Sequence, residues 1–225
     1  MKLKWSGFGA TDGRGKINGH VASKNRSGAY ARTKVTPTNP QTSFQLAARN
    51  LLTSLSQAWR SLTQAQRNAW NAAVADFAKT DIFGDLRNPT GKNLYTRLNI
   101  NLSNVGQALI SVPPLPSGGG SVIAGALTID DTTGFDVAYS GATDGHKIQV
   151  WATPGVSPGK EFLKNDYRLV ATFDGAAVSP YDFSAAYNAR FGGRTVGTRI
   201  GVRLVSVNED TGEMGIPSES TALVA

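Results

Sequence analysis

Cysteine is absent from this 225-residue sequence and histidine occurs only twice, which removes several kinds of chemistry. A chain without cysteine has no disulfide, no thiolate nucleophile and no cysteine-based zinc site. His20 and His146 lie far apart in the sequence, and neither has a second histidine at metal-ligand spacing. We therefore expect no metal site and no cofactor, with each histidine on the surface or in a turn.

Long apolar runs are also missing. No run reaches the roughly 18–20 apolar residues that a membrane-spanning helix needs. The basic residues near the N-terminus, Lys2 and Lys4, are not followed by an apolar stretch, so they do not form a secretory signal. We expect a soluble, non-exported protein with no membrane partner.

The sequence contains none of the local motifs that identify common catalytic sites. No Gly-x-Ser-x-Gly elbow is present, and the glycines between Gly7 and Lys16 lack the spacing of a phosphate-binding loop. Two pairs of acids, Asp130–Asp131 and Glu209–Asp210, stand beside turn residues, where we interpret them as solvated loop acids. These features predict no catalytic residues and no enzymatic activity.

Acidic residues are scarce at the N-terminus, and this scarcity places the whole net charge there. The first 38 residues carry eight basic residues and one acid, Asp12, which together equal the formal net charge of +7 of the whole chain. The segment is rich in Gly, Ser, Asn and Thr, and such a composition buries too little apolar surface to fold alone. We predict an extended basic arm over residues 1–41, in which Ala29–Val35 can form a strand if it is paired.

The arm allows two interpretations. Its cations can contact nucleic-acid phosphates, although only Trp5, Phe8 and Tyr30 are available to stack on bases. Alternatively, the arm lies on a neighbouring protein and pairs as an added strand, which is the interpretation we favour. In a particle that contains DNA, both contacts can occur together. The candidate partner-binding residues are Lys2, Lys4, Trp5, Arg14, Lys16, Lys24, Arg26, Tyr30, Arg32 and Lys34.

Residues 42–111 are predicted to form a small helical domain of about three helices. Apolar residues recur at three- and four-residue steps in the first helix, which gives it a single apolar stripe. Thr63 and Gln66 have capping-box spacing at the start of the second helix, and a third begins near Lys92. The stripe of the first helix consists of Phe44, Ala48, Leu51, Leu52, Leu55, Trp59 and Leu62.

A Pro/Gly linker over residues 112–121, stiff and then flexible, is predicted to join the helices to a β-sandwich over residues 122–225. Short apolar segments separated by turn residues are typical of that architecture. The expected fold class is therefore α+β and multidomain. The predicted strands are Ser121–Ile129, Phe135–Tyr139, Lys147–Ala152, Arg168–Phe173, Thr198–Asn208 and Ser218–Val224.

The end of the chain carries a first resemblance. Arg199–Asn208 reads as a penultimate strand, Glu209–Glu213 as a hairpin, and Ile216–Ser220 as the entry to a closing strand. In this order the three segments resemble the end of a fibronectin type III domain. The early tryptophan of many such domains has no clear counterpart, although Trp151 could supply core bulk. The resemblance implies a fibronectin III-like or Ig-like sandwich.

A second resemblance covers residues 15 to about 106. The ordered motifs are Gly15-Lys16-Ile17-Asn18-Gly19, Asn39-Pro40-Gln41-Thr42, Gln45, Arg49, Trp59, Leu62-Thr63, Arg67 and Trp70. This series is similar to a group of uncharacterised proteins of bacterial viruses and prophages, which often end in a β-sandwich. The resemblance implies a virion part and no catalytic residues.

These observations together predict a structural protein of a tailed bacteriophage virion. We expect it to be head-associated, as a decoration protein or minor capsid component, and anchored by its arm. A tail, collar or fibre-attachment component is the alternative within the particle. The alternative from another class is a nucleic-acid-binding protein of the infected cell. Expected partners are capsid, portal or tail subunits in a symmetric multi-copy assembly, with packaged DNA as a further contact.

Overall fold

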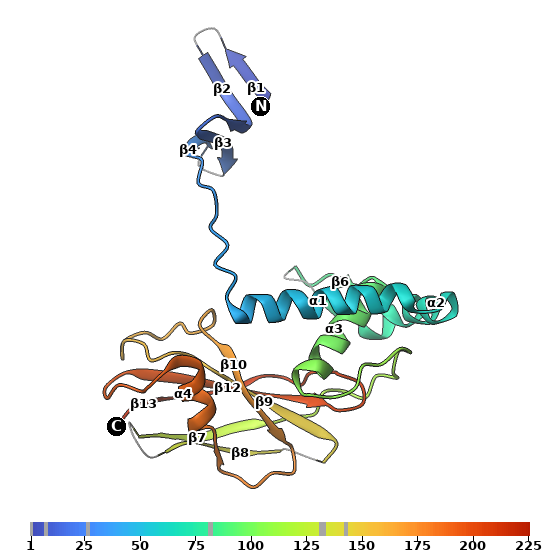
Figure 1. The fold of residues 1–225 in the computed structure, drawn as a ribbon, viewed down its shortest axis with the longest axis vertical. Coiled ribbons are helices and arrows are strands. Elements are labelled where there is room, and N and C mark those ends of the chain that lie inside the picture. Colours follow the sequence, from blue (N-terminus) through green and yellow to red (C-terminus); the bar gives the residue numbers. More distant parts are fainter. Residues whose placement is uncertain (1, 7–8, 26–27, 81–82, 131–133, 142–143) are drawn as a thin grey trace. The chain divides into compact units, whose positions relative to one another are not determined.

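The computed structural model describes residues 2–6, 9–25, 28–80, 83–130, 134–141 and 144–225, with the backbone alone for 2–6, 9–12 and 17. The chain divides into two compact units, Met1–Leu46 and Ala47–Ala225, which we describe one at a time. Helices and antiparallel sheets occur together, which confirms the expected mixture of α and β structure (Figure 1). The finer division of residues 42–225 into a helical domain, a linker and a sandwich stays a prediction.

The first unit is a four-stranded antiparallel sheet. Its strands are β1 (Lys2–Ser6), β2 (Gly9–Ile17), β3 (His20–Asn25) and β4 (Gly28–Thr33), and they pair in sequence order. This corrects the expectation of an extended arm with at most one strand. Only residues 34–42, which have no regular structure, match that expectation.

Tight turns explain why the basic segment folds back on itself. Asn18 joins β2 to β3 with a φ of 43°, a backbone conformation that asparagine tolerates better than most residues. Gly28, which starts β4, has a φ of 118°, where any side chain would be strained. The Asn18-Gly19 dipeptide is a recognised hairpin signal, and the sequence interpretation overlooked it.

Helices form the first part of the second unit. They are α1 (Ser43–Ser61), whose first turn belongs to the first unit, α2 (Gln64–Ala72), the 3₁₀ helix η1 (Ala73–Phe77) and α3 (Gly91–Asn104). A short hairpin of β5 (Lys79–Thr80) and β6 (Leu86–Arg87) lies between η1 and α3. None of the helices within the described residues has both the length and the apolar character needed to cross a bilayer.

The capping box predicted at Thr63 is confirmed. The Thr63 hydroxyl accepts a hydrogen bond from the Gln66 backbone N–H, and the Thr63 backbone N–H donates to the Gln66 side chain at 2.9 Å. These two bonds satisfy backbone donors that would otherwise lack partners at the start of α2. They also fix the tight turn between α1 and α2.

The helical core contains only part of the predicted apolar stripe. Leu55 and Trp70 are fully buried, whereas Phe44 is 55% exposed and Leu52 is 48% exposed. The first three turns of α1 therefore carry apolar side chains that the described residues leave partly exposed. The core cluster consists of Leu55, Trp70, Phe77, Leu94, Tyr95 and Leu98.

The second part of this unit contains two antiparallel sheets. One has the strand order β10-β9-β12-β13 and the other the order β11-β8-β7. All six strands predicted from the sequence are present, whereas β11 and a helix, α4 (Ser184–Phe191), were missed. The strands are β7 (Ile123–Ile129), β8 (Phe135–Ser140), β9 (His146–Ala152), β10 (Arg168–Asp174), β11 (Tyr181–Asp182), β12 (Arg199–Asn208) and β13 (Ser218–Leu223).

Both sheets contribute to one hydrophobic core. Phe135 and Val137 of β8 belong to the same buried cluster as Ile148 of β9 and Leu204 of β12. Tyr187 of α4 joins this cluster and packs edge-to-face on Phe135, with ring centroids 4.8 Å apart. Helix α4 therefore contributes an aromatic side chain that the strand pattern did not predict.

The segment predicted as a flexible linker makes specific contacts with the turn between β12 and β13. The Glu213 carboxylate accepts hydrogen bonds from the backbone N–H groups of Ser117 and Gly118, at 2.7 and 2.9 Å. Ser121 then forms a parallel bridge with Ile216. These bonds hold the glycine-rich end of the segment against the hairpin.

Two of the buried tyrosines, Tyr167 and Tyr187, give the fold a pH dependence. Burial raises the pKa of each phenol to about 12, and the nearby Glu219 carboxylate adds to the effect at Tyr167. Each hydroxyl donates a hydrogen bond, to Glu219 Oε2 at 3.2 Å and to the Thr153 carbonyl at 3.0 Å respectively. The neutral form is therefore favoured in the folded state.

We expect the melting temperature to fall as pH rises from about 10 to about 12, because the unfolded chain releases these protons first. The stability due to the raised pKa values is complete below about pH 10 and is lost as pH passes through the folded-state values. Replacing Tyr187 by Phe should make the fall shallower, measured as melting temperature against pH. An unchanged pH profile in that variant would contradict the assignment.

Candidate partner-binding surface

The register of β2, β3 and β4 places cations on one face of the first sheet. Lys16 pairs with Val21, and Val21 pairs with Arg32, so these three residues form one row across the sheet. Directly opposite residues in an antiparallel sheet have their side chains on the same face. Tyr30 lies on this face too, because alternate residues of a strand share a face.

Lys34 extends this face beyond the end of β4. Its backbone N–H donates to the Gly19 carbonyl at 2.6 Å, so the pairing between the two segments continues by one residue. The Lys16, Arg32 and Lys34 side chains are exposed, and Tyr30 is 44% exposed. We call Lys16, Tyr30, Arg32 and Lys34 the cationic face.

The opposite face of the sheet is different in character. Alternation places His20, Ala22 and Lys24 of β3 there, and the register puts Ala31 opposite Ala22. On β3 and β4 this face carries small side chains apart from His20 and Lys24, and Ile17 of β2 pairs with His20 in the backbone register. Small side chains such as Ala22 and Ala31 allow another backbone or sheet to approach this part of the face closely.

The first unit has no hydrophobic core in its described part. Among residues 13–16, 18–25 and 28–46 none is buried. Isolated hairpins and small sheets are marginally stable in water unless one face packs against another layer. This sheet therefore has the properties of a segment that gains stability from a partner.

The other residues predicted to bind a partner cannot be placed on the cationic face. Arg14 is exposed in β2, but Gly15 with a φ of 117° separates it from Lys16, so strand alternation does not assign Arg14 a face. Lys2 and Lys4 pair with Arg14 and Asp12 in the backbone register. The side chains of Lys2, Lys4 and Trp5, and all of Arg26, lie outside the described residues.

A feature of the chain that the sequence interpretation missed strengthens the charge pattern. After Asp12 the next acidic residue is Asp76, so residues 13–75 contain no Asp or Glu. The cations from Lys24 to Arg60 therefore have no acid within ten residues along the sequence. Inspection of acid spacing, rather than net charge alone, would have found it.

No family model, curated protein or solved structure matches this chain. The function is therefore inferred from the geometry and from the sequence itself. The two histidines lie in different units, His20 in β3 and His146 at the start of β9. In the part of the chain that the structure describes, no three His, Asp or Glu side chains gather as a metal site would need.

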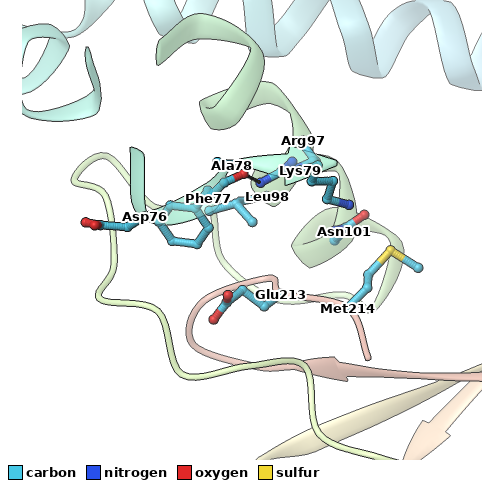
Figure 2. A pocket seen from close by; sticks show the side chains of 9 residues that line it. All are labelled: Asp76, Phe77, Ala78, Lys79, Arg97, Leu98, Asn101, Glu213 and Met214. Atoms are coloured by element: carbon cyan, nitrogen blue, oxygen red, sulfur yellow. Dashed lines mark hydrogen bonds between the residues drawn. The ribbon is translucent and has the colours of Figure 1, made fainter. Parts of the chain in front are cut away.

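The second unit contains a cavity of ≈ 240 Å³ at the junction of its helices with the hairpin after β12 (Figure 2). Arg97, Leu98 and Asn101 enter it from α3, and Glu213 and Met214 enter it from the hairpin. Its volume is below the range of about 300–1,000 Å³ that is usual for ligand pockets. The full lining is Asp76, Phe77, Ala78, Lys79, Arg97, Leu98, Asn101, Glu213 and Met214.

Two charged groups of this cavity, Arg97 and Glu213, have structural partners. The Arg97 guanidinium donates to the Phe77 carbonyl at 3.4 Å, and Glu213 accepts from the Ser117 and Gly118 backbone amides. Burial lowers the pKa of Arg97, and the Glu213 charge offsets part of that decrease. We therefore interpret the cavity as a packing space at a junction, and we place the candidate functional surface on the first sheet.

Proposed function

We propose that this chain is a structural protein of a tailed bacteriophage virion, held to neighbouring head subunits through its N-terminal sheet. The observation that carries the proposal is that this sheet holds an excess of charge and has no buried residue among those described. A sheet of this kind gains stability when a second surface covers it. A neighbouring subunit in a symmetric particle supplies such a surface.

The anchor has two features that suit a protein partner. Strands β1 and β4 are the edges of the sheet, and an edge strand can accept an added strand from another chain. The opposite face carries small side chains at Ala22 and Ala31, which leave room for another layer to pack there. These features support contact by strand addition or by stacking.

The second unit supports the proposal through its strand order. If β7 to β13 are lettered A, B, C, C′, E, F and G, the two sheets read E-B-A and C′-C-F-G. This is the order expected of a fibronectin III-like sandwich, which the sequence of Arg199–Ser220 also resembles. We propose that this domain projects from the particle or contacts a neighbour.

A direct test is mass spectrometry of purified particles with peptide counting, using particles that contain either the full chain or a variant lacking residues 1–38. We expect the full chain to be present at a fixed number of copies per particle. The deletion variant should be present at no more than about a tenth of that number, because it lacks the anchor. Its second unit has its own cores, so misfolding of that unit is not expected to cause the loss. A matched control replaces two exposed lysines of the second unit, Lys92 and Lys164, by Gln. Normal incorporation of the deletion variant would contradict anchoring through the sheet.

The alternative, a nucleic-acid-binding protein that acts in the infected cell, is favoured by one observation, the cationic face. It predicts that purified particles lack the protein. It also predicts submicromolar binding of DNA or RNA at physiological salt that disappears on deletion of residues 1–38. Presence in the particle together with weak binding at that salt supports the structural function.

A further inference from the structure

The cationic face is arranged as a binding surface and not as a diffuse charge. Lys16 and Arg32 flank Val21 in one row, two strand spacings or about 9.6 Å apart. Lys34 follows on the same face, one alternate residue or about 6.7 Å beyond Arg32. Three cations therefore occupy one small area of an exposed sheet.

No acid within the sheet's described side chains competes for these cations. Residues 13–75 contain no Asp or Glu, and Asp12 lies four residues before Lys16 in β2, where the backbone register sets it opposite Lys4 of β1. A cluster of like charges without local counter-ions repels itself and attracts polyanions. The cationic face therefore favours binding of a ligand that carries several negative charges.

The composition of the face distinguishes between two kinds of negatively charged partner, an acidic protein and a nucleic acid. The cores of protein–protein interfaces are depleted in lysine and rich in apolar side chains. Here two lysines and an arginine surround one half-buried valine, Val21, and one exposed tyrosine, Tyr30. Cations beside an exposed aromatic ring are the arrangement that proteins use on nucleic acids, where phosphates meet the cations and a base can stack on the ring.

We infer that the cationic face binds the phosphodiester backbone of a nucleic acid, without sequence preference. Lys16, Arg32 and Lys34 contact phosphates, and the Tyr30 ring is positioned for a base when the strand is single. The inference does not depend on the virion proposal, because that proposal assigns the protein partner to the sheet edges and the opposite face. The two contacts can therefore succeed or fail separately.

Lys24 offers a matched comparison within the same sheet. It lies on β3 in register with Ala29, on the face opposite to Lys16, and it is also exposed. Replacing either lysine by Gln removes the same charge from the same small unit. If net charge alone drives binding, the two variants lose equal affinity; if the cationic face binds, Lys16→Gln loses far more.

The experiment measures binding of the full chain to a fluorescent duplex DNA and to a single-stranded oligonucleotide over a range of salt concentrations. On duplex DNA, each phosphate contact contributes about 0.9 to the steepness of the fall of log K with log salt concentration. Losing one such contact therefore lowers the affinity at 50 mM salt by about tenfold. We expect Lys16→Gln to weaken binding about tenfold at 50 mM salt, and Lys16→Gln with Arg32→Gln about 100-fold, with a slope shallower by about 1.8. Lys24→Gln should change affinity less than about threefold.

Two further arms identify the ligand. If the Tyr30→Leu variant loses affinity for the single strand and not for the duplex, then a base of the single strand stacks on the Tyr30 ring. Poly-glutamate, as an acidic polypeptide, should compete at least tenfold more weakly than DNA at equal charge.

The inference is overturned by equal losses of affinity in Lys16→Gln and Lys24→Gln, by poly-glutamate that competes as well as DNA, or by no binding at 50 mM salt. Far-UV circular dichroism of each variant checks that the sheet remains folded.

Discussion

Replacing Trp70 by Ala is expected to lower the free energy of unfolding of the second unit by about 3–5 kcal/mol, the usual cost of emptying a large aromatic site in a core. Trp70 is fully buried in α2, and its ring meets Tyr95 edge-on with centroids 5.4 Å apart. Its indole N–H also donates to the Ser111 carbonyl at 2.9 Å. The substitution therefore removes packing, an aromatic pair and a hydrogen bond together.

Urea denaturation followed by circular dichroism measures this effect, with two comparison variants. Trp70→Phe keeps a ring but leaves the Ser111 carbonyl unpaired, so a smaller loss of about 1–3 kcal/mol is expected. Phe162→Ala removes a ring that is 64% exposed, and it should change the free energy by less than about 0.5 kcal/mol. A loss below about 1 kcal/mol for Trp70→Ala would show that the helical core is not packed as described.

The second large effect is expected at Gly212, in the turn between β12 and β13. Its φ is 71°, and a Cβ there would overlap the Leu98 carbonyl oxygen and lie 3.0 Å from Leu102 Cγ, both on α3. Asn101 of α3 donates to the Gly212 carbonyl at 2.8 Å. Gly212→Ala should therefore strain the backbone and also push the hairpin away from α3, at a total cost of about 3 kcal/mol or more.

Gly145 is the matched control for this prediction. It has a φ of 77°, close to that of Gly212, but nothing lies within 4 Å of the position a Cβ would occupy. Gly145→Ala should cost only the backbone strain of about 1–2 kcal/mol. Equal losses in the two variants, measured by urea denaturation, would mean that α3 and the hairpin are not in close contact.

The sequence by itself determined the features that depend on near neighbours. Thr63 and Gln66 are three residues apart, so their spacing alone predicts the capping box. Strand segments such as Arg199–Asn208 were located because β-branched and apolar residues recur along them between turn residues. The concentration of charge at the N-terminus is likewise a property of composition.

Contacts between distant segments decided the rest. The stripe of α1 identifies which side of the helix is apolar, but it does not reveal that Phe44 and Leu52 stay exposed while Leu51 and Leu55 pack into the core. The glycines near residue 118 read as a flexible linker, and only the position of Glu213, 95 residues further on, supplies acceptors for their N–H groups. In both cases the partner lies far away in the sequence, so local patterning carries no information about it.

The candidate surface shows the same division. Charge and aromatic content alone predicted which residues bind a partner. That the residues of the cationic face lie together depends on the register of the strands. A shift of one residue in the pairing of β3 with β4 would move Arg32 to the face of Lys24. Register depends on how the hairpins fold, and so only the folded sheet decided which cations act together.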